Sequence, residues 1–163
     1  MRIEQDSSRA TEPRGSSSPA FLLAQVGAHA ASRFAERLRE IDLSPSHAGI
    51  LRILATRPAI TQQALATALG TQPSRLVAMV DELESKEQVE RQLNESDRRR
   101  YALRLTEKGR ATLQAIGKIA RAHKQELLAA LSEEEQRQLA ELLLRVAEQQ
   151  GLAKGVHPGY RGK

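Results

Sequence analysis

The sequence predicts a mainly α-helical protein that carries one small β-hairpin, and three observations support this fold class. Apolar residues recur every three or four positions over most of residues 19–150, which is the spacing of helices with one buried face. Between residues 89 and 105 apolar and polar residues alternate instead, as they do in strands. Two short helix patterns stand directly before that change. This order predicts a winged helix-turn-helix with a helical dimerisation region around it.

The length and composition of the chain limit the classes of protein to which it is able to belong. The chain has 163 residues, of which 40% are hydrophobic and 28% charged, a mixture that suits one globular domain with a core. The apolar runs are shorter than a membrane span, and the first residues lack the apolar stretch of a secretory signal, so we expect a cytoplasmic protein that binds no membrane. Cysteine is absent, which excludes disulfides, thiolate metal sites and thiol redox sensing.

The charge distribution separates two tails from the domain. The net charge is +5 and the pI about 10.0, which favours a polyanionic partner wherever the positive residues cluster. Residues 1–18 are polar with balanced charge, so we expect a disordered tail. Residues 151–163 are glycine-rich and basic, and predict a flexible tail that either attracts phosphate or only aids solubility. The domain is residues 19–150, with the helix-turn-helix and wing at about 44–105.

Four helices are predicted before the hairpin. The first, from Pro19 to Ile41, has the apolar stripe Leu23, Val26, Ala30, Phe34, Leu38 and Ile41. The second begins with Ser44 as N-cap and Pro45 at the first helical position, where the missing N–H of proline costs nothing. Thr61 caps a short third helix that Gly70 closes. The fourth follows at once, from Gln72 to Ser85, and has one apolar face formed by Leu76, Val80 and Leu83.

The hairpin carries a cluster of arginines. Its strands alternate as Val89, Arg91, Leu93 and as Tyr101, Leu103, Leu105. The loop between them holds turn-forming residues up to Asp97 and then Arg98, Arg99 and Arg100. Guanidinium groups on a loop tip are able to neutralise phosphates and enter a narrow minor groove, and Asp97 is able to hold one arginine bidentately and aim its neighbour outward. The alternative is a solvated charged hairpin.

Two further amphipathic helices follow the hairpin. Thr106 caps the first, whose apolar positions are Leu113, Ile116, Ala120, Leu127 and Leu131. Ser132 and Glu135 form a capping box that opens the second, with Leu139, Leu142, Leu143 and Val146 on one face. A winged helix does not need these faces for its own core, so we expect them to form a homodimer with the first helix. The alternative is an intramolecular bundle in a monomer.

Three blocks of the sequence, LSPSHAGILRILA, TQQALATALGTQPSRLVAMVDELESKEQVER and DRRRYALRLTEKG, resemble the corresponding blocks of the MarR family of bacterial transcription regulators, in the same order and at matching spacing. The resemblance covers about Phe21 to Gln149. It implies a dimeric repressor that binds a palindromic operator in double-stranded DNA and is released by a small-molecule effector. A winged-helix module that docks proteins is the alternative, which Val77 and Ala78 on the fourth helix favour.

The resemblance also implies the DNA contacts. Asp97, Arg98 and Arg99 match the wing aspartate and arginines of the family, and Arg100 stands where the family has a small residue. The recognition helix would present Gln72, Ser74 and Arg75 near its N-terminus to the major groove. Arg75 would either read a guanine or contact a phosphate.

One departure from the family lies just before the wing. Glu87 and Gln88 replace its usual pair of a glycine and an apolar residue. A glycine is the residue that most easily takes the left-handed end of a helix. We therefore expect a longer or less sharply ended fourth helix.

No enzyme motif is present. The sequence has neither a phosphate-binding glycine loop nor a serine nucleophile motif, and its histidines lack paired metal spacing, so we expect no enzyme, cofactor or metal. By the resemblance, His29, Arg33 and His47 lie on helices that border an effector cleft, where they would meet an organic or aromatic anion. The alternative is that they are ordinary surface or core residues.

Overall fold

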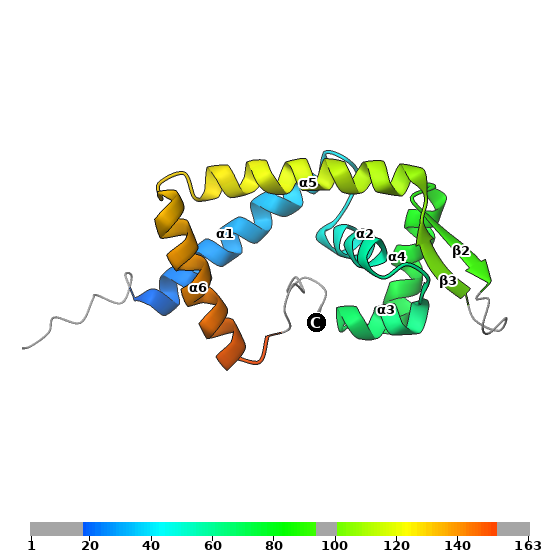
Figure 1. Cartoon of the computed structure of the whole chain (residues 1–163), viewed down its shortest axis with the longest axis horizontal. Coiled ribbons are helices and arrows are strands. Elements are labelled where there is room, and N and C mark those ends of the chain that lie inside the picture. The colour runs from blue at the N-terminus through cyan, green and yellow to red at the C-terminus, as the bar shows by residue number, and fades with distance from the viewer. Residues whose placement is uncertain (1–17, 94–100, 153–163) are drawn as a thin grey trace, which may run out of the picture.

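The computed structural model describes residues 18–93 and 101–152. Along this part of the chain the elements are α1 (Pro19–Arg39), α2 (Pro45–Thr56), β1 (Ile60–Thr61), α3 (Gln62–Leu69), α4 (Pro73–Ser85), β2 (Val89–Leu93), β3 (Tyr101–Leu105), α5 (Glu107–Leu127) and α6 (Glu133–Gln149). Helix α5 runs along one side of the molecule, with α2–α4 and the sheet at one end and α1 and α6 at the other (Figure 1). The mainly helical winged fold is confirmed, whereas the two predicted tails lie almost entirely outside the described residues.

Local capping sets where the helices begin. The side chains of five N-cap residues accept a hydrogen bond from the backbone N–H three residues later; they are Ser18, Ser44, Thr61, Thr106 and Ser132. Each of these bonds satisfies an N–H group that has no partner inside its helix. Gly70 ends α3 with φ 62°, the left-handed conformation that glycine adopts without strain.

The fourth helix ends more sharply than the sequence predicts. Helix α4 stops at Ser85, and Glu87 itself adopts the left-handed conformation with φ 58°. The N–H of Gln88 donates to the carbonyl of Leu83 at 2.9 Å, which closes the helix end. Contacts from the start of α5 hold Glu87, since Thr106 Oγ1 donates to its carbonyl at 2.6 Å and Lys108 Nζ lies 3.2 Å from its carboxylate. These contacts offset the roughly 1 kcal/mol that a left-handed non-glycine residue costs, so the expected longer helix was wrong.

The sheet contains a strand that the sequence did not predict. Its order is β1-β3-β2, and Ile60 of β1 pairs with Leu103. Strands β2 and β3 form the expected antiparallel hairpin. Ala102, between Thr61 and Gln92, is buried, whereas Tyr101 pairs with Leu93 beyond the end of β1 and is 54% exposed. Tyr101 therefore does not join the core face that the alternation predicted.

The core lies between α2, α3, α4 and the sheet. Its fully buried side chains include Leu51, Leu54, Leu65, Leu76, Leu83 and Leu103. Helix α1 adds only Leu38 to the buried set, and α6 buries none of its residues. The predicted stripe of α6 is mostly exposed, whereas on α1 only the first part, Leu23 and Val26, is exposed and Phe34 and Ile41 pack against the core. None of the helices in the described part of the chain has an apolar stretch long enough to cross a bilayer.

Candidate nucleic-acid interface

Helix α4 is fixed by one face and open at its N-terminus. Leu76, Val80 and Leu83 are fully buried and attach the helix to the core. Gln72, Ser74 and Arg75 are all exposed at its start, and the Gln72 side chain makes no capping hydrogen bond. The first N–H groups of α4 therefore remain available to an anion. The three residues predicted for the recognition helix lie together at this open end.

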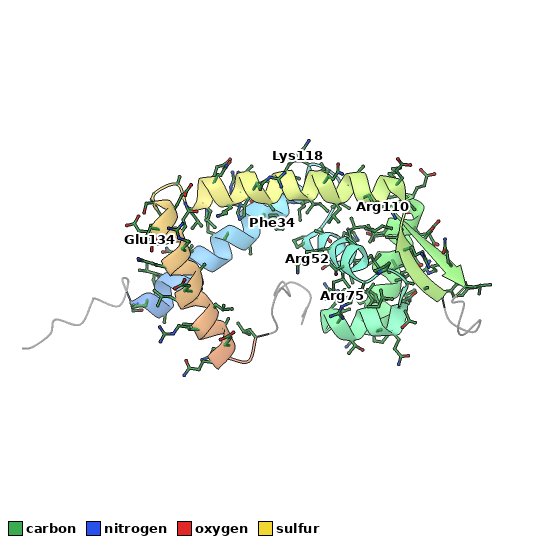
Figure 2. The ribbon with its side chains drawn as sticks, in the orientation of Figure 1. Phe34, Arg52, Arg75, Arg110, Lys118 and Glu134 are labelled. Carbon is green, nitrogen blue, oxygen red and sulfur yellow. The ribbon has the colours of Figure 1, made fainter. Side chains whose placement is uncertain are left out.

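Arg75 is the cation of this open end. Figure 2 places it where α3 passes into α4. Its side chain is exposed and forms no ion pair with any acidic residue in the described ranges. A guanidinium in this position keeps all its N–H donors for a partner outside the chain.

The other end of α4 is clamped to the wing. Arg91 of β2 forms ion pairs with Asp81, at 2.5 Å, and with Glu84, both on α4. The backbone N–H of Arg91 also donates to the Glu84 carboxylate at 3.3 Å. A guanidinium that binds two carboxylates fixes direction as well as distance. Arg91 thus sets the orientation of the wing strands relative to the recognition helix, a role that sequence reasoning missed.

A second clamp joins α4 to the turn before α2. Lys86, the C-cap of α4, lies 2.8 Å from the Asp42 carboxylate and donates to the Asp42 carbonyl at 2.7 Å. The Lys86 ammonium lowers the pKa of Asp42 because it hydrogen-bonds and attracts the charged carboxylate. The C-terminal half of the recognition helix is therefore attached both to strand β2 of the wing and to the turn before α2.

His47 is part of the same support. Its Nε2 lies 3.0 Å from the Glu82 carboxylate of α4, and its Nδ1 accepts the backbone N–H of Ser44 at 3.3 Å. The side chain is buried, and burial lowers the pKa of His47 although Glu82 acts in the opposite direction. Both ring nitrogens thus have partners within the chain. His47 as an effector residue stays a prediction, but its geometry is that of a link between α2 and α4.

We expect stability to depend on pH through His47. Its pKa is lower in the folded than in the unfolded protein, so the unfolded chain binds the proton more tightly and acid destabilises the fold. The contribution is complete above the unfolded pKa of about 6.5 and is lost as the pH falls through the folded value. The variant His47→Gln keeps a capping-box partner but does not titrate. Urea unfolding at about pH 7.5 and 5.5 should therefore show a smaller loss of unfolding free energy in the variant than in the native protein.

His123 is a second source of acid sensitivity in this experiment. Burial lowers the pKa of His123 too, and this histidine is present in both proteins. Some acid sensitivity therefore remains in the variant. An identical pH dependence in the two proteins would show that His47 does not contribute.

The other two predicted effector residues lie on α1. His29 is exposed, and Arg33 pairs with Glu36 at 2.7 Å. Beside them, His123 of α5 packs on the Phe34 ring with 5.5 Å between ring centroids. Burial lowers the pKa of His123, and the charges of Arg37, Arg33 and His29 act in the same direction. Sequence reasoning missed His123 and Arg37 because α1 and α5 are far apart along the chain.

The predicted wing tip cannot be placed in the same way. Asp97, Arg98, Arg99 and Arg100 lie outside the described residues, so the structure describes only the strands that carry them. Within the described ranges, no group of three histidine or acidic side chains is placed to hold a metal ion.

A helix pair with an open second N-terminus, followed by a hairpin clamped to that helix, defines the class of winged helix-turn-helix proteins. Comparison with known proteins narrows the class. The model of the MarR family matches residues 43–101, and a structure of the transcriptional repressor CouR bound to a 23-mer DNA duplex is 31% identical with a TM-score of 0.71, covering 81% of this chain and 94% of that chain. The chain belongs to the MarR family of transcription regulators.

Two other similar proteins are also transcription regulators by their names. A MarR mutant from E. coli complexed with operator DNA is 27% identical with a TM-score of 0.67, covering 78% of this chain and 91% of that chain. The "Putative transcriptional regulatory protein for hcr operon" of Thauera aromatica is 35% identical over 107 residues, which are 66% of this chain. The match spans only 64% of the length of that curated relative. Membership in a family of regulators agrees with the prediction that the chain is not an enzyme.

Proposed function

We propose that this protein is a dimeric repressor that binds a palindromic operator through α4 and the wing and is released by a small organic effector. The observation that carries the proposal is the open start of α4, where Gln72, Ser74 and Arg75 are exposed on a helix clamped at its other end. A rigid helix with a free N-terminus suits the major groove. The DNA duplexes bound to two similar structures support this reading.

Footprinting tests the proposal. The purified protein is added to DNA from immediately upstream of its own gene and to an unrelated fragment of equal length, at several salt concentrations. We expect a symmetric protected site on the first fragment that persists at salt concentrations where nonspecific binding is lost. Absence of binding to any DNA would overturn the proposal and favour protein docking, for which the exposed Val77 on α4 is the available surface.

Arg75 should read a base. We expect Arg75→Ala to weaken operator binding by about 1–3 kcal/mol and unrelated DNA by less, because a bidentate guanine contact is sequence-specific. Arg75→Lys should not restore the preference, since an ammonium lacks the paired donors. Fluorescence anisotropy on both DNAs measures this, with the exposed Arg39→Ala as control. Equal losses on the two DNAs would assign Arg75 to a phosphate contact.

The wing tip should contribute phosphate and minor-groove contacts. We expect Arg99→Ala to weaken operator binding and to reduce the salt slope by about one phosphate equivalent. Asp97→Ala should also weaken binding although it removes a negative charge, because Asp97 would orient an arginine. Salt titrations of both variants measure these effects. Tighter binding by Asp97→Ala would refute the orienting role and indicate simple repulsion.

A second copy of the chain would cover the open faces of α1 and α6. On α1, Phe21 and Val26 are 47% and 49% exposed, and on α6, Leu142 and Val146 are 56% and 44% exposed. A monomer rarely leaves a contiguous apolar surface of this kind uncovered. A two-fold dimer would place two recognition helices about 34 Å apart, one turn of DNA. The palindromic operator follows from that symmetry.

The effector would be an anion that binds near the contact of α1 and α5. His29, Arg33, Arg37 and His123 bring positive or protonatable groups together there, beside the Phe34 ring. Such a surface suits an aromatic carboxylate. Adding benzoate derivatives to the protein–operator complex should release the DNA, and Arg33→Gln should need more of the compound. Failure of every aromatic carboxylate to release DNA would remove this effector class.

A further inference from the structure

An open groove runs from the wing strands along the first half of α5. Its volume is about 1140 Å³, and residues of the end of α2, of β2 and β3, and of α5 line it. The larger apolar lining residues Leu54, Leu105 and Leu113 are buried or half-buried, and no aromatic residue lines the groove. The exposed lining residues are charged and polar side chains together with Ala55 and Pro58, and none of them is a large apolar residue.

Four cations line this groove. They are Arg104 of β3 and Arg110, Lys118 and Arg121 of α5. None of the four forms an ion pair within residues 18–93 and 101–152, whereas Arg37, Arg91 and Arg137 all do. Unpaired cations that face one groove raise its positive potential.

The acidic residues of the lining stand at one end. Glu90 and Glu107 are the two acids of the groove, and Glu90 accepts a hydrogen bond from Gln92 at 2.7 Å. Beyond Glu107, helix α5 carries no acidic residue before Glu126. The positive charge therefore extends along α5 away from the wing.

The row of cations on α5 is long enough to contact several phosphates of a regular polyanion. Arg110 and Arg121 are eleven residues apart on one helix, which is about 16 Å at 1.5 Å per residue. One strand of B-DNA places about five phosphates over that rise. Figure 2 shows Arg110 near the wing strands and Lys118 further along α5.

We propose that this groove binds the sugar–phosphate backbone of DNA that flanks the operator on the outer side of each wing. The inference rests on the proposed DNA binding and extends it to a second contact surface. The groove begins on the strands that carry the wing, so DNA that continues past the wing reaches it by bending toward α5. A protein partner would use exposed aromatic or large apolar side chains, which this lining lacks. The contact is independent of base sequence except through the ease of bending.

DNA length tests the proposal. The affinity of the native protein is measured for a duplex of the operator core alone and for the same core with about 20 additional base pairs on each side, which cover two turns of DNA. We expect binding to the longer duplex to be on the order of tenfold tighter and its salt slope to be steeper, by about 0.9 for each added phosphate contact. The variant Arg110→Gln/Lys118→Gln/Arg121→Gln should bind both duplexes as the native protein binds the core.

A variant with an equal loss of charge is the control. Arg39→Gln/Arg137→Gln/Arg145→Gln removes three exposed cations outside the groove and should keep the preference for the longer duplex. Equal loss of the preference in both variants would indicate general electrostatics and overturn the groove contact. Equal native affinity for both duplexes would also overturn it, while specific binding to the core leaves the proposed repressor intact. Absence of core binding would remove both proposals.

Discussion

A single charge on the open face of α1 or α6 should convert the protein to a monomer and abolish tight operator binding. Val26→Asp and Leu142→Glu each place a carboxylate on a side chain that is about half exposed in the protomer and that the proposed dimer would bury. An unpaired buried charge is one of the most destabilising changes an interface can suffer. Because two linked recognition helices bind far better than one, we expect operator affinity to fall on the order of a hundredfold or more. Size-exclusion chromatography with light scattering, and anisotropy on the operator, measure the two effects.

The control for this experiment lies on the same helix. Leu144→Glu adds the same charge to a side chain that is 47% exposed, but on the opposite side of α6 from Leu142 and Val146. This variant should remain a dimer. Circular dichroism shows whether each variant keeps its helices, since some dimers have no stable monomer. Folded, dimeric Val26→Asp and Leu142→Glu proteins would place the interface elsewhere.

Gly109→Ala should destabilise the fold by about 3 kcal/mol, the upper part of the range for overpacking. A Cβ on Gly109 would overlap the carbonyl oxygen of Gln88 and come within 3.2 Å of Leu105 Cδ2. The Gln88 carbonyl has no freedom to move away, because it also accepts the N–H of Thr106 at 3.2 Å. The clash would push the start of α5 away from Gln88, which lies between α4 and β2. Urea unfolding measures the loss of free energy.

A second glycine of α5 is the matched control. At Gly117 an added Cβ would meet only the flexible end of Arg121, at 3.6 Å. Gly117→Ala should therefore stabilise the protein by about 0.5–1 kcal/mol, the usual gain for alanine over glycine in a helix. A Gly109→Ala protein as stable as the native one would mean that the first turn of α5 is able to shift. Opposite signs for the same substitution would confirm that close packing, not helix propensity, sets the effect.

The helices and the hairpin are readable in the sequence because their causes are local. An N-cap such as Ser44 and a helix end such as Gly70 act on backbone groups within a few residues. The change from a helical to an alternating pattern at Val89 identifies the two hairpin strands. The capping box of Ser132 and Glu135 was predicted for the same reason. Interactions of this range do not depend on the rest of the fold.

Elements that depend on distant contacts were not readable. Strand β1 has two residues, and only its pairing with Leu103 identifies it as a strand. Glu87 takes a conformation that favours glycine because Thr106 and Lys108, from the start of the next helix, bind it. A propensity argument about Glu87 alone therefore gave the wrong helix end.

The residues of the candidate site divide in the same way. The sequence by itself determined the order of the elements and, through the resemblance to the MarR family, the place of Arg75 near the start of the recognition helix. Only the tertiary structure decided that Arg91 clamps the wing to α4, that His47 supports α4 through Glu82, and that cations of β3 and α5 line one groove. The physical reason is the distance along the chain over which each kind of interaction acts. Capping and periodicity act within one or two turns of the chain, whereas ion pairs and grooves form between segments that meet only when the core packs.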